Sequence, residues 1–143
     1  MKNILFSLFI LFSAVSCGRE IIDYKITDKY NYVNKSNTDM AIYSYNQGQK
    51  TKHLMSKENT YSQELDLNSG SVEDIIFYAD SVKIVYGQSR FKVWKATDNN
   101  SRNILMRPEN YTKTAEKENY TEYQFTFITQ DAVQTLPCNG NYN

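Results

Sequence analysis

Apolar and polar residues alternate in short runs along most of this chain, which is the period-two pattern of half-buried β-strands. Clusters of Asn, Ser, Asp and Gly separate the runs, and these residues favour turns because their side chains bond to nearby backbone groups. The clearest runs are Tyr30–Val33, Met40–Tyr45, Thr60–Leu67, Asp80–Tyr86 and Tyr123–Ile128. The pattern predicts an all-β fold, a small antiparallel β-sandwich or sandwich-like barrel of about seven to nine strands.

Two hairpins are expected from the order of these runs. The runs at Tyr30–Val33 and Met40–Tyr45 flank a polar turn and are expected to pair antiparallel. Residues 82–86 and 91–95 flank Gly87-Gln88-Ser89, and we expect Phe91 and Val93 to lie opposite the apolar face of the first strand. This register places Trp94 on the other face, where it either points outward or packs against a second sheet.

Other segments are less regular. Residues 49–55 carry a weaker strand pattern, and residues 72–78 suit either a helical turn or a buried strand. Residues 104–106 are expected to return to the core between the polar segments 97–103 and 112–119. Thr129 is expected to cap one short helical turn over residues 131–135, because its hydroxyl can accept from an amide in the first turn.

The N-terminus has the pattern of a secretory signal. Lys2 precedes an apolar run from Ile4 to Val15, which is too short to cross a hydrocarbon core that takes about 20 helical residues. An N-terminal core helix is the alternative, but it would show polar residues at helical spacing. The run therefore predicts a signal peptide.

The residues Ala14-Val15-Ser16-Cys17 resemble the lipobox of bacterial lipoproteins. By that resemblance residues 1–16 are removed and Cys17 is acylated, which attaches the protein to a membrane. An ordinary secretory signal with an incidental cysteine is the alternative. The expected organisation is a signal peptide at 1–16, a lipidated tether at 17–28, a single β domain at 29–136 and a frayed tail at 137–143.

Charge and cysteine content exclude some functions. The 143-residue chain has 16 basic and 16 acidic residues, and Lys2 is the only charged residue of the expected signal peptide. No nucleic-acid partner is expected, because such binding needs a concentrated basic face. With Cys17 acylated, Cys138 has no partner within the chain, so we expect no intramolecular disulfide and leave the role of this thiol open.

Candidate chemistry is sparse. His53 is the only histidine, and the sequence has neither a glycine-rich phosphate loop nor a cysteine pair typical of metal sites. Neighbouring acids at 73–74 and at 116 and 118 are typical of solvated turns. We therefore expect no cofactor, no metal site and no enzymatic activity.

Two softer signals concern single residues. Asp80-Ser81-Val82 resembles the tripeptide that Bacteroidetes glycosylate on exported proteins, which makes Ser81 a candidate for an O-glycan; the alternative is that Asp80-Ser81 only begins a strand. The chain is also rich in aromatics, and Tyr43, Tyr45 and Trp94 are candidate ligand contacts. The alternative for these three is burial between two sheets.

A family resemblance covers roughly residues 30–133. The segments Asp80–Tyr86, Asn110-Tyr111 and Tyr123–Thr129 are similar to those of small lipoproteins of Bacteroidetes. The resemblance implies a compact β-sandwich-like domain in the cell envelope and implies no activity. The outer membrane is the expected location, with the side of the membrane left open.

These observations predict a non-catalytic, lipid-anchored envelope protein that binds a protein or a glycan. The alternative is an inhibitor or immunity-type lipoprotein that acts against a cell-wall hydrolase. That role needs a projecting loop, for which residues 97–103 and 112–119 are the candidates. A hydrolase is disfavoured because the residues that it needs are missing.

Overall fold

The computed structural model describes residues 25–69, 72 and 74–137. The expected signal peptide, the expected lipidation site Cys17, most of the expected tether, and Cys138 with the rest of the tail lie outside these residues. In the part of the chain that is described, no helix is long and apolar enough to span a bilayer.

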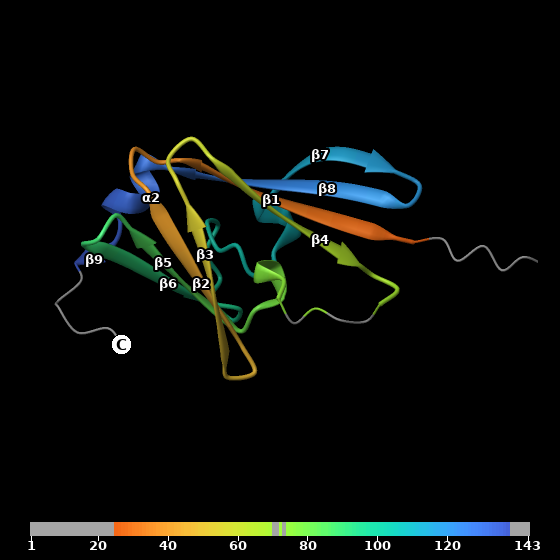
Figure 1. The fold of residues 1–143 in the computed structure, drawn as a ribbon, viewed down its shortest axis with the longest axis horizontal. Helices are drawn as coiled ribbons and strands as arrows, with labels where there is room; N and C mark the ends of the chain where they lie inside the picture. Colours follow the sequence, from red (N-terminus) through yellow and green to blue (C-terminus); the bar gives the residue numbers. More distant parts are fainter. Residues whose placement is uncertain (1–24, 70–71, 73, 138–143) are drawn as a thin grey trace, which may run out of the picture.

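The described residues form a small all-β, sandwich-like fold of two sheets, as the alternation predicts (Figure 1). All pairings are antiparallel except that of β1 with β8, which is parallel. The first sheet has the order β4 (Thr60–Asp66), β1 (Thr27–Lys35), β8 (Tyr120–Ile128), β7 (Thr112–Lys117). The second has the order β3 (Gln49–Met55), β2 (Met40–Asn46), β5 (Ser81–Tyr86), β6 (Arg90–Lys95), β9 (Leu136–Pro137).

The core lies between the two sheets. Tyr32 and Phe125 of the four-stranded sheet and Ile42 and Ile84 of the five-stranded sheet are fully buried or nearly so. Trp94 of β6 meets Phe125 edge to face, with ring centroids 6.5 Å apart. Burial of large aromatic side chains therefore joins the two layers.

The first expected hairpin is wrong, because β1 and β2 lie in different sheets. The turn between them is a corner built on buried polar side chains: Asn34 Nδ2 donates to the carbonyls of Thr38 (3.0 Å) and Ser56 (3.1 Å). Strand β2 pairs instead with β3 across Gln47-Gly48, where φ is 49° and 82°. Positive φ at both positions is the geometry of a two-residue hairpin turn.

The second hairpin forms, but in a register one residue away from the expected one. Val82 pairs with Trp94 and Tyr86 with Arg90, so the connecting loop has three residues. Directly paired residues share a face of the sheet, and an odd loop therefore puts Trp94 on the core side and Val93 on the outside. Phe91 and Val93 would face the core, as expected from the sequence, only if the loop had an even number of residues.

Of the two structures expected for residues 72–78, a helical turn and a buried strand, the helical turn is present. Residues 75–79 contain a short 3-10 helix, η1 (Ile76–Tyr78), whose Ile76 and Phe77 are buried. Gln63 of β4 holds it: its Oε1 accepts from the Ile76 N–H at 2.9 Å. The turn closes one side of the core.

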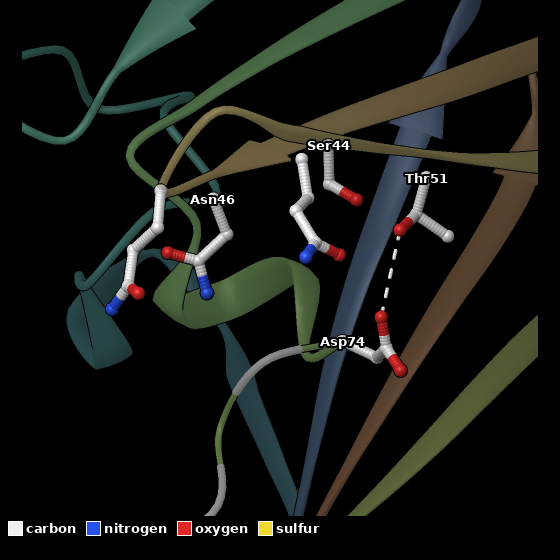
Figure 2. Close-up of a pocket in the computed structure, with 6 residues that line it drawn as sticks. Ser44, Asn46, Thr51 and Asp74 are labelled. Carbon is white, nitrogen blue, oxygen red and sulfur yellow. Dashed lines mark hydrogen bonds between the residues drawn. The ribbon is translucent and has the colours of Figure 1, made fainter.

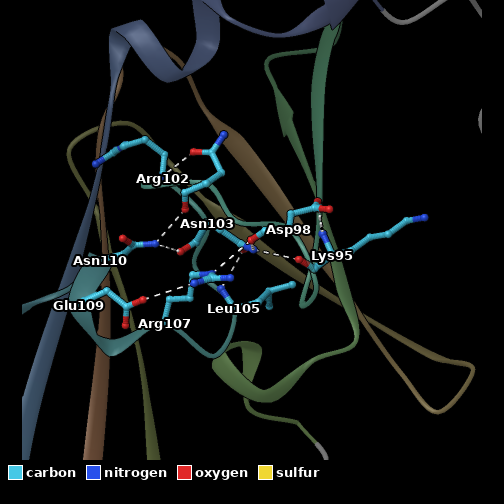
Figure 3. Close-up of polar contacts among 9 residues, drawn as sticks. Lys95, Asp98, Arg102, Asn103, Leu105, Arg107, Glu109 and Asn110 are labelled. Atoms are coloured by element: carbon cyan, nitrogen blue, oxygen red, sulfur yellow. Dashed lines mark hydrogen bonds and ion pairs between the residues drawn. The ribbon is translucent and has the colours of Figure 1, made fainter.

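The segment between β6 and β7 folds back onto the core and does not project (Figure 3). Asn103 is fully buried and donates to the carbonyls of Lys95 (2.9 Å) and Asp98 (3.0 Å). Ile104 and Leu105 are buried as expected, whereas Met106 is 50% exposed. A 3-10 helix, η2 (Pro108–Asn110), leads into β7.

Two further expectations are corrected at the C-terminal end. Residues 112–117 form the edge strand β7 and not a loop. The short helix α2 (Thr129–Val133) is present, but Thr129 does not cap it. Asp131 does so, because its Oδ2 accepts from the Ile128 N–H at 2.9 Å. Strand β9 (Leu136–Pro137) ends the described residues.

Candidate functional site

Charge divides unequally between the two sheets. The strands of the four-stranded sheet carry five acidic residues, Asp28, Glu64, Asp66, Glu116 and Glu122. The strands of the five-stranded sheet carry no Asp or Glu and six basic residues, Lys50, Lys52, Lys83, Arg90, Lys92 and Lys95. A nearly neutral chain therefore has a basic layer.

Four of these lysines share the outer face of the five-stranded sheet with two tyrosines. In the register, Tyr43 lies between Lys52 and Lys83, and Tyr45 pairs with Lys50. Lys95 lies in the same row as Tyr45, because it pairs with Ser81, which pairs with Tyr45. We call this surface, made of Lys50, Lys52, Lys83, Lys95, Tyr43 and Tyr45, the lysine–tyrosine face.

Three of the four lysines have their ammonium groups over aromatic rings. The Nζ atoms of Lys50 and Lys52 lie 4.8 and 5.6 Å from the centroid of the Tyr43 ring. Lys83 Nζ lies 5.1 Å from the centroid of Phe91. Such cation–π contacts favour these ammonium positions over the sheet by about 0.5 to 1 kcal/mol each at exposed sites. Because two ammonium groups cover Tyr43, its ring is not an open platform on which a sugar could stack.

An apolar row crosses the same face next to the lysines. Register places Leu54, Ala41, Val85, Phe91 and Leu136 side by side over five strands. The two ends of the row are well exposed, Leu54 at 72% and Leu136 at 65%. One end of the row lines an open groove of about 450 Å³ together with Tyr43 and Lys52.

The carboxylate at this groove is already engaged. Asp39 lies at its rim, and its Oδ1 accepts from the Lys57 N–H at 2.9 Å. Within the described residues, no ion pair joins Lys50, Lys52 or Lys95 to an acid. The face therefore presents positive charge outward.

Ser81 lies on this face as the first residue of β5 and is half-buried. Asp80, beside it, accepts from the Gln47 N–H through Oδ2 at 2.8 Å and so supports the β2–β3 turn. This hydrogen bond gives Asp80 a structural role that does not require a glycan at Ser81. The O-glycan at Ser81 stays a prediction.

One of the three candidate ligand-contact aromatics is corrected by the structure. Trp94 is 2% exposed and belongs to the core between the sheets, so a surface ligand does not reach it. Tyr43 and Tyr45 are partly exposed on the outer face. Of the three, the structure brings only the tyrosines to one surface.

A small polar pocket lies at the tip of the β2–β3 hairpin (Figure 2). Its volume is about 80 Å³, and Ser44, Asn46, Thr51 and Asp74 are among the residues that line it. Thr51 donates to Asp74 at 3.5 Å. Drug-sized ligands need roughly 300 Å³ or more, so this pocket suits a few water molecules.

His53 lies on the inner side of the same hairpin, where its ring packs on Tyr61 with centroids 4.7 Å apart. Burial lowers the pKa of His53, and the Asp74 carboxylate opposes that shift. Its Nε2 is buried without a hydrogen-bond partner, so no hydroxyl is bound to it as a nucleophile would be. Among the described residues, no group of three His, Cys, Asp or Glu side chains could hold a metal ion.

Comparisons of the chain with models of protein families, with curated proteins and with solved structures found no match.

The lysines of the outer face were missed in the sequence. Lys50 and Lys52 at positions i and i+2 share one face of a strand, and this local signal could have indicated them. Lys83 and Lys95 join them only through strand pairing.

Proposed function

We propose that this protein is a non-catalytic, lipid-anchored module of the cell envelope that binds an anionic partner through the lysine–tyrosine face. The observation that carries the proposal is the basic outer surface of the five-stranded sheet, whose strands contain no acidic residue. The anchor rests on the resemblance of residues 14–17 to a lipobox. The outer membrane is the proposed location.

The geometry of the face supports binding and gives no support to catalysis. Ordered ammonium groups attract anions over distances up to the Debye length, about 8 Å at physiological ionic strength. The cation–π contacts of Lys50, Lys52 and Lys83 reduce the conformational entropy that these side chains would lose on binding. The face thus favours binding of an anion. It contains no His, Asp or Glu that could act as the general base in acyl or phosphoryl transfer.

The inhibitor alternative has less support than the binding module, because most of its two candidate loop segments does not project. Residues 97–103 are drawn onto the core by Asn103, and residues 112–117 are the edge strand β7. Residues 97–103 therefore give this alternative no support, and of residues 112–119 only the β7–β8 turn at 118–119 lies outside a strand.

The test compares two triple variants of the intact protein with equal changes in net charge. The first, Lys50→Gln/Lys52→Gln/Lys83→Gln, removes charge from the lysine–tyrosine face. The second, Lys29→Gln/Lys113→Gln/Lys117→Gln, removes it from the four-stranded sheet. Binding of each to dextran sulfate, with neutral dextran as the blank, is measured over a range of salt concentrations.

We expect the first variant to bind dextran sulfate at least about tenfold more weakly, because each lost contact to a polyanion also removes a released counterion. The second variant should bind like the wild type. Equal weakening of both variants, or no binding by the wild type, would contradict the proposal. Matching circular dichroism spectra and melting temperatures show that both variants fold.

A further inference from the structure

We infer that the anionic partner of the lysine–tyrosine face is the surface of an anionic phospholipid bilayer, on which the β domain lies flat. This inference rests on the proposed function and adds the chemistry of the occupant. Three observations favour a bilayer over a soluble polyanion.

The first is the apolar row beside the lysines. Leu54, Leu136 and the neighbouring Val93 are 72%, 65% and 46% exposed on the same outer face. A soluble acidic chain would leave these side chains in water. A bilayer takes up apolar side chains at the headgroup boundary while lysines contact the phosphates.

The second is the arrangement of positive charge around aromatic rings. Tyr43 and Tyr45 lie among Lys50, Lys52 and Lys83, with the lysine stems across the sheet. Tyrosine favours the membrane interface, because its ring is apolar and its hydroxyl is polar. Lysine stems also cover apolar surface while the ammonium group reaches outward.

The third is the spacing of the lysines. Lys52 and Lys83 flank Tyr43 from the strands on either side of it, so they lie two strand spacings apart, about 10 Å. Lys50 and Lys95 occupy the adjoining row over the same sheet. A plane of separate anionic headgroups can meet all four at once, whereas a single linear chain follows one row.

The tether sets how far the domain can lie from a membrane that holds residue 17. From residue 17 to Thr27, where β1 begins, the backbone can span at most roughly 35 Å. Acyl chains at residue 17 would attach the chain to the membrane, and a basic face adds to such attachment. Each lysine near an anionic surface strengthens binding by about fivefold.

The test measures lysine accessibility in the mature protein purified from its own membranes. The intact mass first reports the acyl chains at Cys17. The protein is then reconstituted into vesicles of phosphatidylcholine alone or of phosphatidylcholine with phosphatidylglycerol. An amine-reactive reagent labels exposed lysines, and peptide mass spectrometry gives the labelling rate at each position.

We expect phosphatidylglycerol to lower the labelling of Lys50, Lys52, Lys83 and Lys95 by at least about threefold relative to phosphatidylcholine. Labelling of Lys29, Lys113 and Lys117 on the four-stranded sheet should not change. Equal labelling of the two sets in both vesicles would overturn the inference.

A second pair of variants tests the apolar contribution. At high salt, where charge is screened, Leu54→Ser should lose the remaining protection of the four lysines, and Leu67→Ser, exposed beyond β4, should keep it. Protection by added polygalacturonate and not by phosphatidylglycerol vesicles would overturn the bilayer as occupant and leave the proposed function standing. If dextran sulfate binding has also failed, the proposed function falls as well.

Discussion

Single buried amides hold the irregular segments of this protein in place. Asn103 Oδ1 accepts from the Leu105 N–H at 3.0 Å, and its Nδ2 donates to two carbonyls of the turn after β6. Asn34 makes an equivalent set of contacts at the corner between β1 and β2. Since buried backbone groups need partners, these two side chains replace the ladder bonds that the loops lack.

Substitution of Asn103 by Ala should destabilise the fold by about 1 to 3 kcal/mol, because it removes two hydrogen bonds to the carbonyls of Lys95 and Asp98 and leaves the Leu105 N–H without its acceptor. The measurement is the midpoint and slope of urea unfolding. Asn99→Ala, exposed in the same loop, is the matched control and should change stability by less than about 0.5 kcal/mol. Similar values for the two variants would contradict the role given to Asn103.

The partial burial of His53 predicts a pH dependence of stability. Burial lowers the pKa of His53 below its ordinary value of 6.5, so the unfolded chain binds the proton more readily than the folded chain. Stability from this group is therefore complete above pH 6.5 and is lost as the pH falls from there towards the lowered pKa. Urea unfolding at pH values from about 8 down to about 5.5, which span the ordinary titration range of histidine, measures this loss of stability.

His53→Gln is the control for this pH dependence. It should flatten the stability profile between neutral pH and the onset of carboxylate titration. An unchanged profile in the variant would show that other groups cause the slope.

At the scale of elements, the β5–β6 hairpin decides which side chains enter the core. Its three-residue loop puts Trp94 inside and Val93 outside. Gly87 supports the loop with φ of 58°, a left-handed conformation that costs a residue with a Cβ about 1 kcal/mol or more. A loop longer or shorter by one residue would exchange the two faces of β6.

Trp94→Ala should therefore cost about 3 to 5 kcal/mol, because it leaves a large cavity against Phe125 between the sheets. Val93→Ala, on the exposed face, should cost less than about 1 kcal/mol. Thermal and urea unfolding of the two neighbouring variants test the register directly. The opposite order of costs would show that the hairpin pairs as first expected from the sequence.

A charged contact joins the loop after β6 to helix α2. Arg102 Nε donates to Asp131 Oδ1 at 2.9 Å, and the guanidinium stacks over Phe125, 4.4 Å from its centroid. The side chain of Asp131 is only 4% exposed. The pair therefore connects three elements through one buried carboxylate.

Arg102→Met should destabilise the protein by about 3 to 5 kcal/mol, since it leaves the Asp131 carboxylate buried without its cation. Adding Asp131→Asn should recover part of that loss, because no charge then remains in the site. A double-mutant cycle of urea unfolding gives the coupling. Additive single effects would show that the two side chains do not act as a pair.

At the scale of the whole molecule, the proposal depends on attachment at residue 17 and on one charged face. We expect Cys17→Ser to move the protein from the membrane fraction to the soluble fraction of the envelope when membranes are washed at high salt, because the residue that would carry the acyl chains is gone and the lysine contacts are screened. Fractionation by ultracentrifugation with intact mass measurement checks it. Acyl chains found at another residue, or membrane attachment of Cys17→Ser that is unchanged at high salt, would contradict this expectation.

Much of the fold could be predicted from the local sequence. The strands β2, β4, β5 and β8 lie where the alternation places them, because the period of two depends only on neighbouring residues. Ile104 and Leu105 were also expected in the core. Which strand pairs with which was not predicted well, since pairing depends on contacts between distant segments.

The sequence by itself determined that this chain is built of strands, since the alternation of side chains along each segment is a local property. Only the tertiary structure decided that β1 leaves β2 to pair with β4 and β8, and that Trp94 faces inward. The lysine–tyrosine face also belongs to this second group. Its members lie between positions 43 and 95, and the pairing of four strands places them on one surface while burial of the aromatic core turns that surface outward.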